Sequence, residues 1–420
     1  MNICIFEDDK YEDLYPMTLT RPTCELKCGH TLLWEKIARA FPGVDIAFSV
    51  RDYIAPTFKR RTGGRAVNDL EGLAADDTLF INGRWLFDTQ TRLDLEGPEE
   101  VGLCGGQIAY VRAKRGTISE IISRGVGAFL EDGKAKLSQK TVEAVLIDYP
   151  WDLIMGNPGA IEEDFKALNK SGIHGVVHPM AVILGDETNI YVSERAEIQP
   201  FVVLDATHGP ILIDEGVTVF PNSRVEGPTC VGRDTQIVET NLREGCAIGP
   251  VCRVGGEVEE SIIHGYSNKY HAGFLGHSYV GEWVNLGALT TNSDLKNDYS
   301  EVDLYIRGKL TKSGTNKLGS FIGDHTKTSI GALLSTGTVI GVMSNLLTAG
   351  EPMPKGIPSF VWYFRGKFSR GVGFKKTVET AATVMGRREI EQTQEDVDLL
   401  QVVHDLTQEE RRAVLRRRRG

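Results

Sequence analysis

The chain of 420 residues has no apolar run of 18 residues, so we expect no membrane-spanning helix. Its first nine residues become acidic too early for a secretory signal peptide. Basic charge is in deficit, because 47 Lys and Arg face 57 Asp and Glu, giving a net charge of −10. This balance argues against a nucleic-acid partner. The exception is the basic tail at 416–420, which we interpret as a solvated end, with an anion-binding arm as the alternative.

Paired cysteines are also lacking. The seven cysteines are an odd number without framework spacing, which indicates reduced thiols and a cytoplasmic location. Cys24 and Cys28 have no second pair nearby, so we expect two part-buried thiols rather than a zinc site. Hydrophobic residues make up 41% and charged residues 25%, an ordinary globular balance. The length predicts two or three domains.

Residues 1–170 alternate short apolar runs with helical patterns, which predicts an α/β domain with a parallel sheet and helices on both faces. The predicted strands are Ile3–Phe6, Asp45–Val50, Thr78–Asn82 and Gly106–Arg112. The predicted helices are Thr31–Phe41, Thr117–Ser123 and Glu162–Asn169.

From about residue 182 an apolar or small residue recurs every six positions, the signature of a hexapeptide repeat. The anchors are Leu184, Ile190, Ala196, Val202, Ile213, Val219, Val225, Val231, Ile237, Ile248, Val254, Phe274, Val280, Leu286, Ile322, Thr328, Leu334, Ile340 and Leu346. A period of six fits neither an amphipathic helix nor simple strand alternation. It predicts a left-handed parallel β-helix over 171–350, with one inward anchor on each face of a triangular coil.

Two segments interrupt this period, at Glu260–Tyr270 and Leu295–Leu318, and insertions in solenoids emerge as loops on one face. Prolines after about Gly350 are expected to end the coil. A C-terminal extension over 351–420 follows, with helices predicted at Thr377–Arg388 and Thr393–Arg417.

His271 follows the first interruption and precedes the anchor Phe274, so it can stand at the mouth of a groove. Because imidazole titrates near neutral pH, such a histidine can deprotonate an amine or a hydroxyl. A surface or capping histidine is the alternative. Asn285, Asn292 and Lys296 supply the amide and ammonium groups that a sugar phosphate needs, although a plain polar loop would look the same.

The run from His271 to Gly341 resembles the acetyltransferase half of the bifunctional GlmU family, in its archaeal and Bacteroidetes-type versions. The family stretch His-x-x-aromatic-Leu/Val-Gly…Val-Asn-x-Gly-Ala is matched at His271, Phe274, Leu275, Gly276, Val284, Asn285, Gly287 and Ala288. The family stretch Leu-Gly-x-Phe-Ile-Gly-x-His-x-Lys-Thr is matched within Lys317–Thr328. Phe274 stands where the family often has tyrosine, and Leu289 replaces a glycine.

The resemblance implies that His271 is the general base on the amino group of a hexosamine 1-phosphate, for which glucosamine 1-phosphate is the expected sugar. Asn285 would hold the sugar, with Phe274, Asn292 and Lys296 as further substrate-binding residues. Acetyl-CoA, as co-substrate, would lie against the residues Ala288 and Ser329. The family also implies a homotrimer.

The front half resembles sugar nucleotidyltransferases, which implies a Rossmann-like domain. Leu14–Pro22, Phe80–Gly83 and Tyr149–Leu153 carry the likeness. Three family features are absent: Glu7, Asp8 and Asp9 replace a glycine loop, Thr23 replaces a lysine, and Arg84 replaces a metal-binding aspartate. An acidic loop repels phosphate and arginine offers Mg²⁺ no oxygen ligand.

A nucleotide site can nevertheless survive on other residues. Thr20, Arg21, Asn82 and Arg84 are the candidates for binding the phosphates, because arginine matches phosphate geometry. The expected reaction is nucleotidyl transfer from UTP or dTTP to a sugar 1-phosphate, with Mg²⁺ as a possible cofactor. The product would be of the UDP-N-acetylglucosamine type.

Two further hypotheses stay open. A zinc hydratase like the γ-class carbonic anhydrases shares the coil, and His264, His271, His277 and His325 offer imidazoles. A regulatory or binding trimer with a degenerate front half is the other. The repeat predicts the fold and leaves the chemistry to the site.

Overall fold

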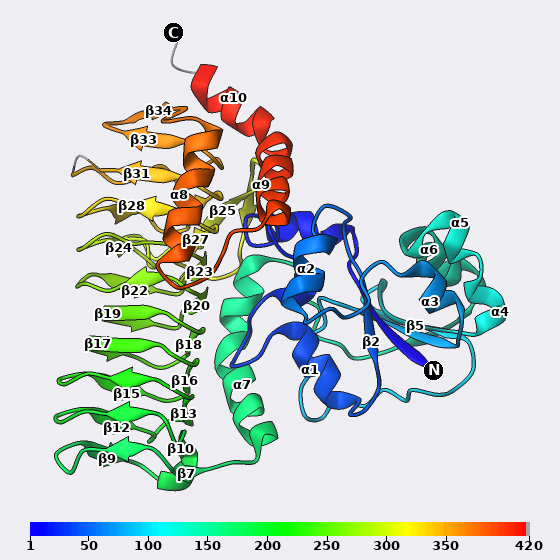
Figure 1. The fold of residues 1–420 in the computed structure, drawn as a ribbon, viewed down its shortest axis with the longest axis horizontal. Helices are drawn as coiled ribbons and strands as arrows, with labels where there is room; N and C mark the ends of the chain where they lie inside the picture. The colour runs from blue at the N-terminus through cyan, green and yellow to red at the C-terminus, as the bar shows by residue number, and fades with distance from the viewer. Residues whose placement is uncertain (349, 417–420) are drawn as a thin grey trace. The chain divides into compact units, whose positions relative to one another are not determined.

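The computed structural model describes residues 1–348 and 350–416, the side chains of 122 and 123 aside. Of the basic tail at 416–420, only Arg416 lies within the described residues. The chain divides into two compact units (Figure 1). Unit 1 comprises Met1–Leu14, Thr20–Leu26 and Thr31–Tyr149, and unit 2 comprises Tyr15–Leu19, Lys27–His30 and Pro150–Gly420. The domain limits expected at 170 and 350 stay predictions.

Unit 1 contains a six-stranded sheet in the order β2-β1-β3-β5-β4-β6. Its strands are β1 (Asn2–Phe6), β2 (Ile46–Ser49), β3 (Thr78–Asn82), β4 (Glu100–Cys104), β5 (Gln107–Ala113) and β6 (Ser138–Thr141). The predicted strands are confirmed, but the expected all-parallel sheet is wrong, because β5 runs antiparallel to both β3 and β4. Gly105 and Gly106, with φ of 55° and 80°, form the tight hairpin that reverses the chain.

Short helices accompany this sheet. They are α1 (Leu33–Ala40), α2 (Ala55–Arg61), α3 (Leu70–Ala74), α4 (Arg115–Ile118), α5 (Ile121–Arg124) and α6 (Val126–Lys136). The helix predicted at Thr117–Ser123 is two short helices, α4 and α5. Phe129 and Leu130 of α6 pack with Val101 and Val111 in one buried cluster, which fixes this helix on the sheet.

The long segment of unit 2 begins with α7 (Pro150–Leu168), which packs against the coil. The helix predicted at Glu162–Asn169 is only its last part. Pro158 lies inside α7 and hides its length from sequence patterns. Asn157, directly before Pro158, donates to the Gly245 carbonyl at 2.8 Å, which fastens the helix to the coil.

The rest of unit 2 is the predicted β-helix (Figure 1). One face is a parallel sheet of β7 (Gly172–Ile173), β10 (Ile190–Val192), β13 (Ile211–Ile213), β16 (Thr229–Val231), β18 (Cys246–Ile248), β20 (Ile262–Gly265), β23 (Tyr279–Glu282), β27 (Phe321–Ile322), β30 (Val339–Ile340) and β32 (Gly356–Ile357). The second face holds β8 (Val176–Val177), β11 (Glu197–Ile198), β14 (Thr218–Val219), β17 (Gln236–Leu242), β19 (Arg253–Glu259), β21 (Asn268–Lys269), β28 (Lys327–Thr328), β31 (Asn345–Leu347) and β33 (Trp362–Phe364). The third face holds β9 (Val182–Leu184), β12 (Val203–Asp205), β15 (Arg224–Glu226), β22 (Phe274–Gly276), β24 (Thr291–Asn292) and β29 (Leu333–Leu334), with β17 and β19 extending onto it.

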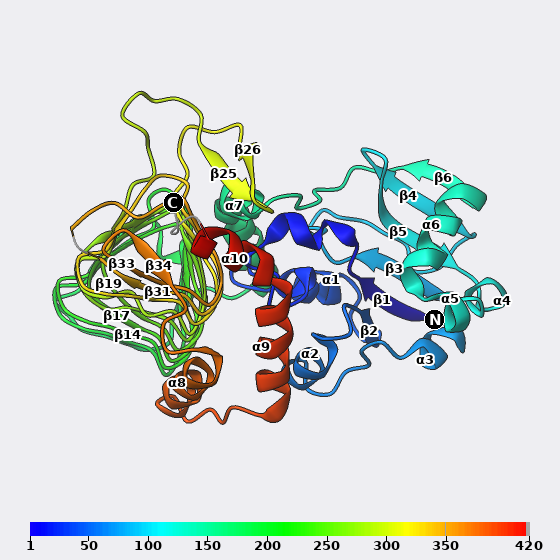
Figure 2. The same cartoon turned by 90° about the horizontal axis from the view of Figure 1, so that it is seen from above.

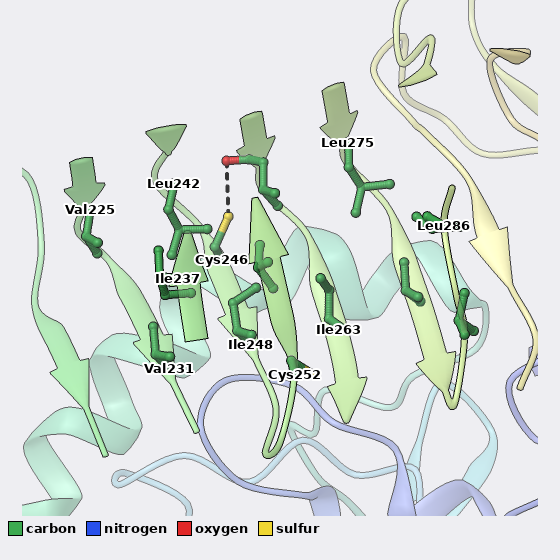
Figure 3. Packing of buried hydrophobic residues seen from close by; sticks show 14 of the residues in the cluster. Val225, Val231, Ile237, Leu242, Cys246, Ile248, Cys252, Ile263, Leu275 and Leu286 are labelled. Carbon is green, nitrogen blue, oxygen red and sulfur yellow. Dashed lines mark hydrogen bonds between the residues drawn. The ribbon is translucent and has the colours of Figure 1, made fainter. Parts of the chain in front are cut away.

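The repeat anchors form the core of this coil, as Figure 3 shows for Val225 to Leu286. Two predicted anchors are wrong by one residue. Leu184 is 42% exposed and Phe274 is half-buried, whereas Ile183 and Leu275 pack inward. Successive strand residues point to opposite faces, so a one-residue slip at an interruption exchanges inside for outside.

Of the two predicted insertions, only the second leaves the coil. Leu295 pairs with Lys317 at its base, and β25 (Asp303–Ile306) and β26 (Lys309–Lys312) form a hairpin (Figure 2). The insertion expected at Glu260–Tyr270 is wrong, because β20 and β21 continue the coil there. Glu260 and Tyr266, with φ of 39° and 53°, turn its corners and break the hexapeptide period.

The coil also continues past Gly350, because β32 and β33 add a turn and β34 (Lys367–Ser369) pairs with β33. Three helices follow: α8 (Phe374–Gly386), α9 (Gln394–Leu406) and α10 (Gln408–Arg416). The single helix predicted from Thr393 is divided at Thr407. Within the described residues, no helix combines the length and apolar character that crossing a bilayer requires.

Candidate functional site

Three predicted acetyl-transfer residues lie along one edge of the coil. His271 stands in the turn between β21 and β22, Ala288 one coil further on, and Ser329 one coil beyond that. Backbone hydrogen bonds join these turns: Leu289 donates to Ala272 at 2.8 Å, and Gly331 donates to Ala288 at 2.7 Å. Each pair links adjacent coils, so Ala288 and Ser329, which follow His271 by 17 and 58 positions, reach the same edge. The His271 side chain is exposed, as a general base open to substrate must be.

The same edge carries exposed apolar side chains. Tyr270 is 44%, Leu289 60% and Ile330 73% exposed. The rings of Tyr270 and His271 meet edge to face with 5.1 Å between centroids. Grouped apolar side chains on a surface are typical of an interaction site. Leu289, which departs from the family glycine, points outward with φ of 61° and does not crowd the coil interior.

A buried lysine fixes the turn that carries His271. Lys269 lies opposite the core residue Val254, and its Nζ donates to the carbonyls of Gly255 and Gly273 at 2.6 Å and of His271 at 3.3 Å. Burial lowers the pKa of Lys269 to about 8. The sequence does not identify this residue, because a lysine in a polar interruption of the repeat gives no sign that its side chain points inward.

Asn285, the predicted sugar ligand, is exposed on the second face. Asn268 lies beneath it on the preceding coil, with its Nδ2 3.4 Å from the Asn285 Oδ1. Arg388, which follows α8, donates to the Asn268 Oδ1 at 2.9 Å. The C-terminal segment therefore contacts Asn268, the neighbour of Asn285, although Arg388 and Asn268 are 120 positions apart in the sequence.

The other predicted substrate ligands are held within the protein. Asn292 is 3% exposed, accepts from the Gly276 N–H at 2.9 Å and donates to the Gly276 carbonyl at 3.0 Å. Lys296 donates to the Ser300 Oγ at 3.2 Å within the insertion, and Phe274 is half-buried. Sugar binding by Asn292 stays a prediction that would require this pairing to open.

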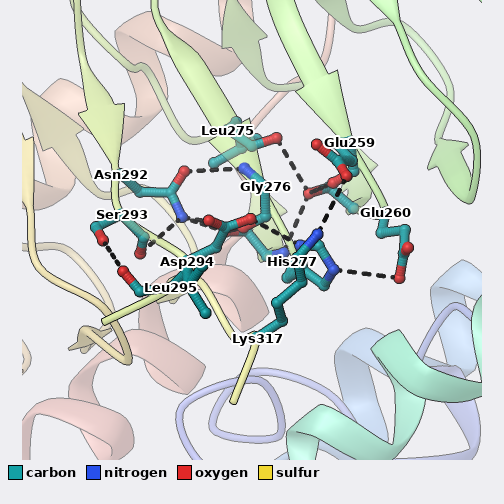
Figure 4. Close-up of polar contacts among 12 residues, drawn as sticks. Glu259, Glu260, Leu275, Gly276, His277, Asn292, Ser293, Asp294, Leu295 and Lys317 are labelled. Carbon is teal, nitrogen blue, oxygen red and sulfur yellow. Dashed lines mark hydrogen bonds and ion pairs between the residues drawn. The ribbon is translucent and has the colours of Figure 1, made fainter. Parts of the chain in front are cut away.

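A charged cluster closes the base of the insertion (Figure 4). His277 is 5% exposed, with its Nδ1 2.9 Å from Asp294 and its Nε2 3.3 Å from Glu260, while Lys317 lies 3.7 Å from Glu259. Burial alone would lower the pKa of His277, but the two carboxylates raise it to about 9. The imidazolium therefore joins Asp294, at the start of the insertion, to the coil beneath it.

In unit 1 the predicted phosphate residues Asn82 and Arg84 lie at the carboxyl end of β3. In the sheet, β2 lies on one side of β1 and β3 on the other, so the strand order reverses at β1. Open α/β sheets bind ligands at such a switch point, outside the carboxyl ends of the strands. Asp8, after β1, accepts from the Arg84 Nε and Nη2 at 2.8 and 2.7 Å, and Asp148 accepts from its Nη1 at 2.9 Å. Gln107 accepts at 2.7 Å.

These contacts occupy the donors that the sequence assigned to phosphate. Arg84 is fully buried, and Asn82, also fully buried, donates to Asp8 at 2.9 Å. Arg21 and Thr20 are 2% and 5% exposed. Phosphate binding by these residues stays a prediction, and at Arg84 it requires the guanidinium to exchange a carboxylate for the ligand.

The position at which Arg84 replaces the family's metal-binding aspartate does not fit a divalent cation in this arrangement. Its carboxylates, Asp8 and Asp148, are both paired with Arg84. Across residues 1–348 and 350–416, His, Cys, Asp and Glu form no group of three or more that could hold a metal. The zinc-hydratase hypothesis thus has no geometric support among the four histidines named for it.

Comparisons with known proteins agree with the resemblance. Residues 3–172 match the family model described as sugar nucleotidyl transferase. A bifunctional sugar-1-phosphate nucleotidylyltransferase/acetyltransferase of Sulfurisphaera tokodaii is 39% identical over 90 residues, 21% of this chain and 22% of that protein. The bifunctional protein GlmU of Rippkaea orientalis is 30% identical over 158 residues, 33% of this chain and 34% of that protein.

The chain therefore spans about a fifth to a third of the length of these relatives. A crystal structure of a UDP-N-acetylglucosamine acyltransferase is 17% identical and covers 52% of this chain and 83% of that one. The TM-score of this match is 0.27, which is too low to bear on the topology described above. Residues 3–172 thus match the sugar nucleotidyl transferase family, and further parts of the chain are similar to GlmU and to the bifunctional sugar-1-phosphate enzyme.

Proposed function

We propose that unit 2 transfers the acetyl group of acetyl-CoA to the amine of a hexosamine 1-phosphate, with glucosamine 1-phosphate as the expected acceptor. The observation that carries this proposal is the alignment of His271, Ala288 and Ser329 on adjacent coils. His271 takes a proton from the attacking ammonium, the nitrogen adds to the thioester carbonyl, and the C–S bond breaks to release coenzyme A. Asn285 orients the sugar, and the backbone at Ala288 faces the acyl donor.

For unit 1 we propose nucleotidyl transfer from UTP or dTTP to the resulting sugar 1-phosphate, with release of pyrophosphate. The position of Asn82 and Arg84 at the switch point of the sheet supports it. The pairing of Arg84 with Asp8 and Asp148 favours a second candidate, a front half that binds nucleotide without turnover. An assay of pyrophosphate release distinguishes these candidates, because a binding module yields no pyrophosphate. It combines the purified protein with hexosamine 1-phosphate, acetyl-CoA and each nucleotide in turn.

If phosphate exchanges with a carboxylate at Arg84, then weakening that carboxylate should strengthen nucleotide binding. Asp148→Asn removes the charge that competes for the Arg84 Nη1 while keeping the side chain's shape. A charged hydrogen bond is worth about 1.5–3 kcal/mol, so we expect UTP to bind at least about tenfold more tightly. Calorimetric titration measures this change.

Glu96→Gln serves as the matched control, because Glu96 is an exposed acid of unit 1 and the variant makes the same change in net charge. If Asp148→Asn and the unaltered protein bind UTP with equal affinity, Arg84 does not bind the phosphates.

We also propose a homotrimer, because the exposed apolar edge around His271 needs a partner surface and closed cyclic symmetry limits assembly to a fixed number. Sedimentation at micromolar concentration should give three chains per particle, and Leu289→Glu should reduce this number. A particle of one chain in the unaltered protein would contradict the proposal. None of the seven cysteines, all of which lie in the described part of the chain, forms a disulfide, and this favours a reducing compartment such as the cytoplasm.

A further inference from the structure

A cavity of about 440 Å³ lies among the C-terminal helices, away from the His271 edge. It is lined by the last turn of α9, by the start of α10, by the start of α8 and by the coil residue Phe360. Figure 1 shows α8 running back along the coil and α9 returning to the far end. The volume falls in the range of small-molecule sites.

The lining of this cavity is strongly basic. Arg370, Arg411 and Arg412 line it together with His404, and the described lining residues include no carboxylate. Two nearby acids contact lining residues: Asp405 lies 3.2 Å from the His404 Nδ1, and Glu409 pairs with Arg412 at 2.8 Å. Three guanidinium groups thus line the cavity, and only that of Arg412 is paired with a carboxylate, so the excess of positive charge suits an anion.

Arg411 is the buried member of this group. It is 6% exposed, its Nη1 donates to the Thr407 Oγ1 at 2.6 Å, and its Nη2 donates to the His404 carbonyl. In the part of the chain that the structure describes, no carboxylate lies within ion-pair distance of Arg411 or Arg370. A buried guanidinium with only neutral acceptors is costly, and a bound anion would offset that cost.

Two further features favour a phosphate that carries an aromatic ring. The rings of Phe360, Phe374 and His404 meet with centroids 4.9–5.8 Å apart, and the Arg411 guanidinium lies 5.6 Å from the Phe360 ring. The amino end of α8 also lines the cavity at Gly373 and Phe374, and no side chain of the N-cap residue Gly373 caps its first N–H groups.

We propose that this cavity binds a nucleoside diphosphate, with its phosphates on Arg370, Arg411 and Arg412 and its base against Phe374. Phe360 lies four coils beyond His271 in the order of the first face. At about 4.8 Å per coil this places the cavity roughly 19 Å further along the axis. It is therefore a binding site separate from the acetyl-transfer edge.

The test is calorimetric titration of the full-length protein with ADP, and separately with inorganic pyrophosphate. Arg370→Gln is the principal variant, because Arg370 is exposed and its replacement leaves the helix packing intact. We expect its affinity for ADP to fall about tenfold to a hundredfold, as for loss of a charged hydrogen bond. Arg365→Gln is the matched control, since Arg365 is exposed and does not line the cavity.

Phe374→Leu should weaken ADP and leave pyrophosphate unchanged, because only the nucleotide carries a base. Acetyl transfer should proceed at the unaltered rate in Arg370→Gln. The proposal would be overturned if Arg370→Gln and the double variant Arg370→Gln/Arg412→Gln both bound ADP with the affinity of the unaltered protein. So would competition between ADP and acetyl-CoA together with a raised KM for acetyl-CoA in Arg370→Gln, because the cavity would then belong to the acetyl-transfer site.

Discussion

Replacing His271 by alanine (His271→Ala) should lower the rate of acetyl transfer by about 10²–10⁴-fold, the contribution of a positioned general base. The amine must lose a proton as it attacks the thioester, and His271 is the exposed imidazole on the edge shared with Ala288 and Ser329. The turn itself should persist, because Lys269 holds the backbone carbonyl of residue 271 and not its ring. Initial rates at saturating acetyl-CoA measure the effect.

The control for this variant is His208→Ala, which removes another exposed imidazole of unit 2. It should retain the full acetyl-transfer rate. Both variants should keep the melting temperature and the particle size of the unaltered protein. Full activity in His271→Ala would assign the base to another residue. A large drop in its melting temperature would instead show that His271 supports the fold.

Replacing His277 by glutamine (His277→Gln) should destabilise unit 2 by about 3 kcal/mol, since removing one partner of a buried ion pair leaves the others uncompensated. Asp294 and Glu260 flank the imidazole at 2.9 and 3.3 Å, and His277 is 5% exposed. Denaturant unfolding at pH 6.5 measures the loss. His208→Gln, the same exchange at an exposed site, should leave the unfolding midpoint unchanged.

The effect of His277 should also depend on pH with a defined sign. The pKa of His277 is raised from 6.5 to about 9 in the folded protein, so the folded state binds the proton more tightly than the unfolded chain. Its contribution is fully present below pH 6.5 and is lost as the pH rises through 9. The difference in unfolding free energy between the unaltered protein and His277→Gln should therefore shrink toward pH 9.5. A difference that stays constant from pH 6 to 9.5 would contradict the assignment.

The sequence by itself determined the architecture of unit 2. A six-residue period has one structural solution, a stack of flat faces with one inward residue each, and Ile190, Val219 and Ile340 are fully buried as predicted. It also determined the first strands of unit 1, whose apolar runs can only be buried. Within these repeats each residue's environment follows from its local position, so local patterns were sufficient.

Only the tertiary structure decided the details at each break of the period. Leu275 rather than Phe274 points inward, and Glu260–Tyr270 stays in the coil, because corner residues with positive φ shift the register by amounts that the sequence leaves open. The antiparallel β5 depends likewise on a Gly-Gly turn whose partner strand was not predicted.

The charged contacts were also beyond the sequence. Arg84 meets Asp8 and Asp148 across 76 and 64 positions, and Arg388 meets Asn268 across 120. Whether a charged side chain is open to a ligand or already paired depends on which distant residue the fold brings beside it. The sequence could therefore name His271, Asn285 and Arg84 as candidates by residue type, while their exposure and their partners were set by chain segments far away, which no local pattern encodes.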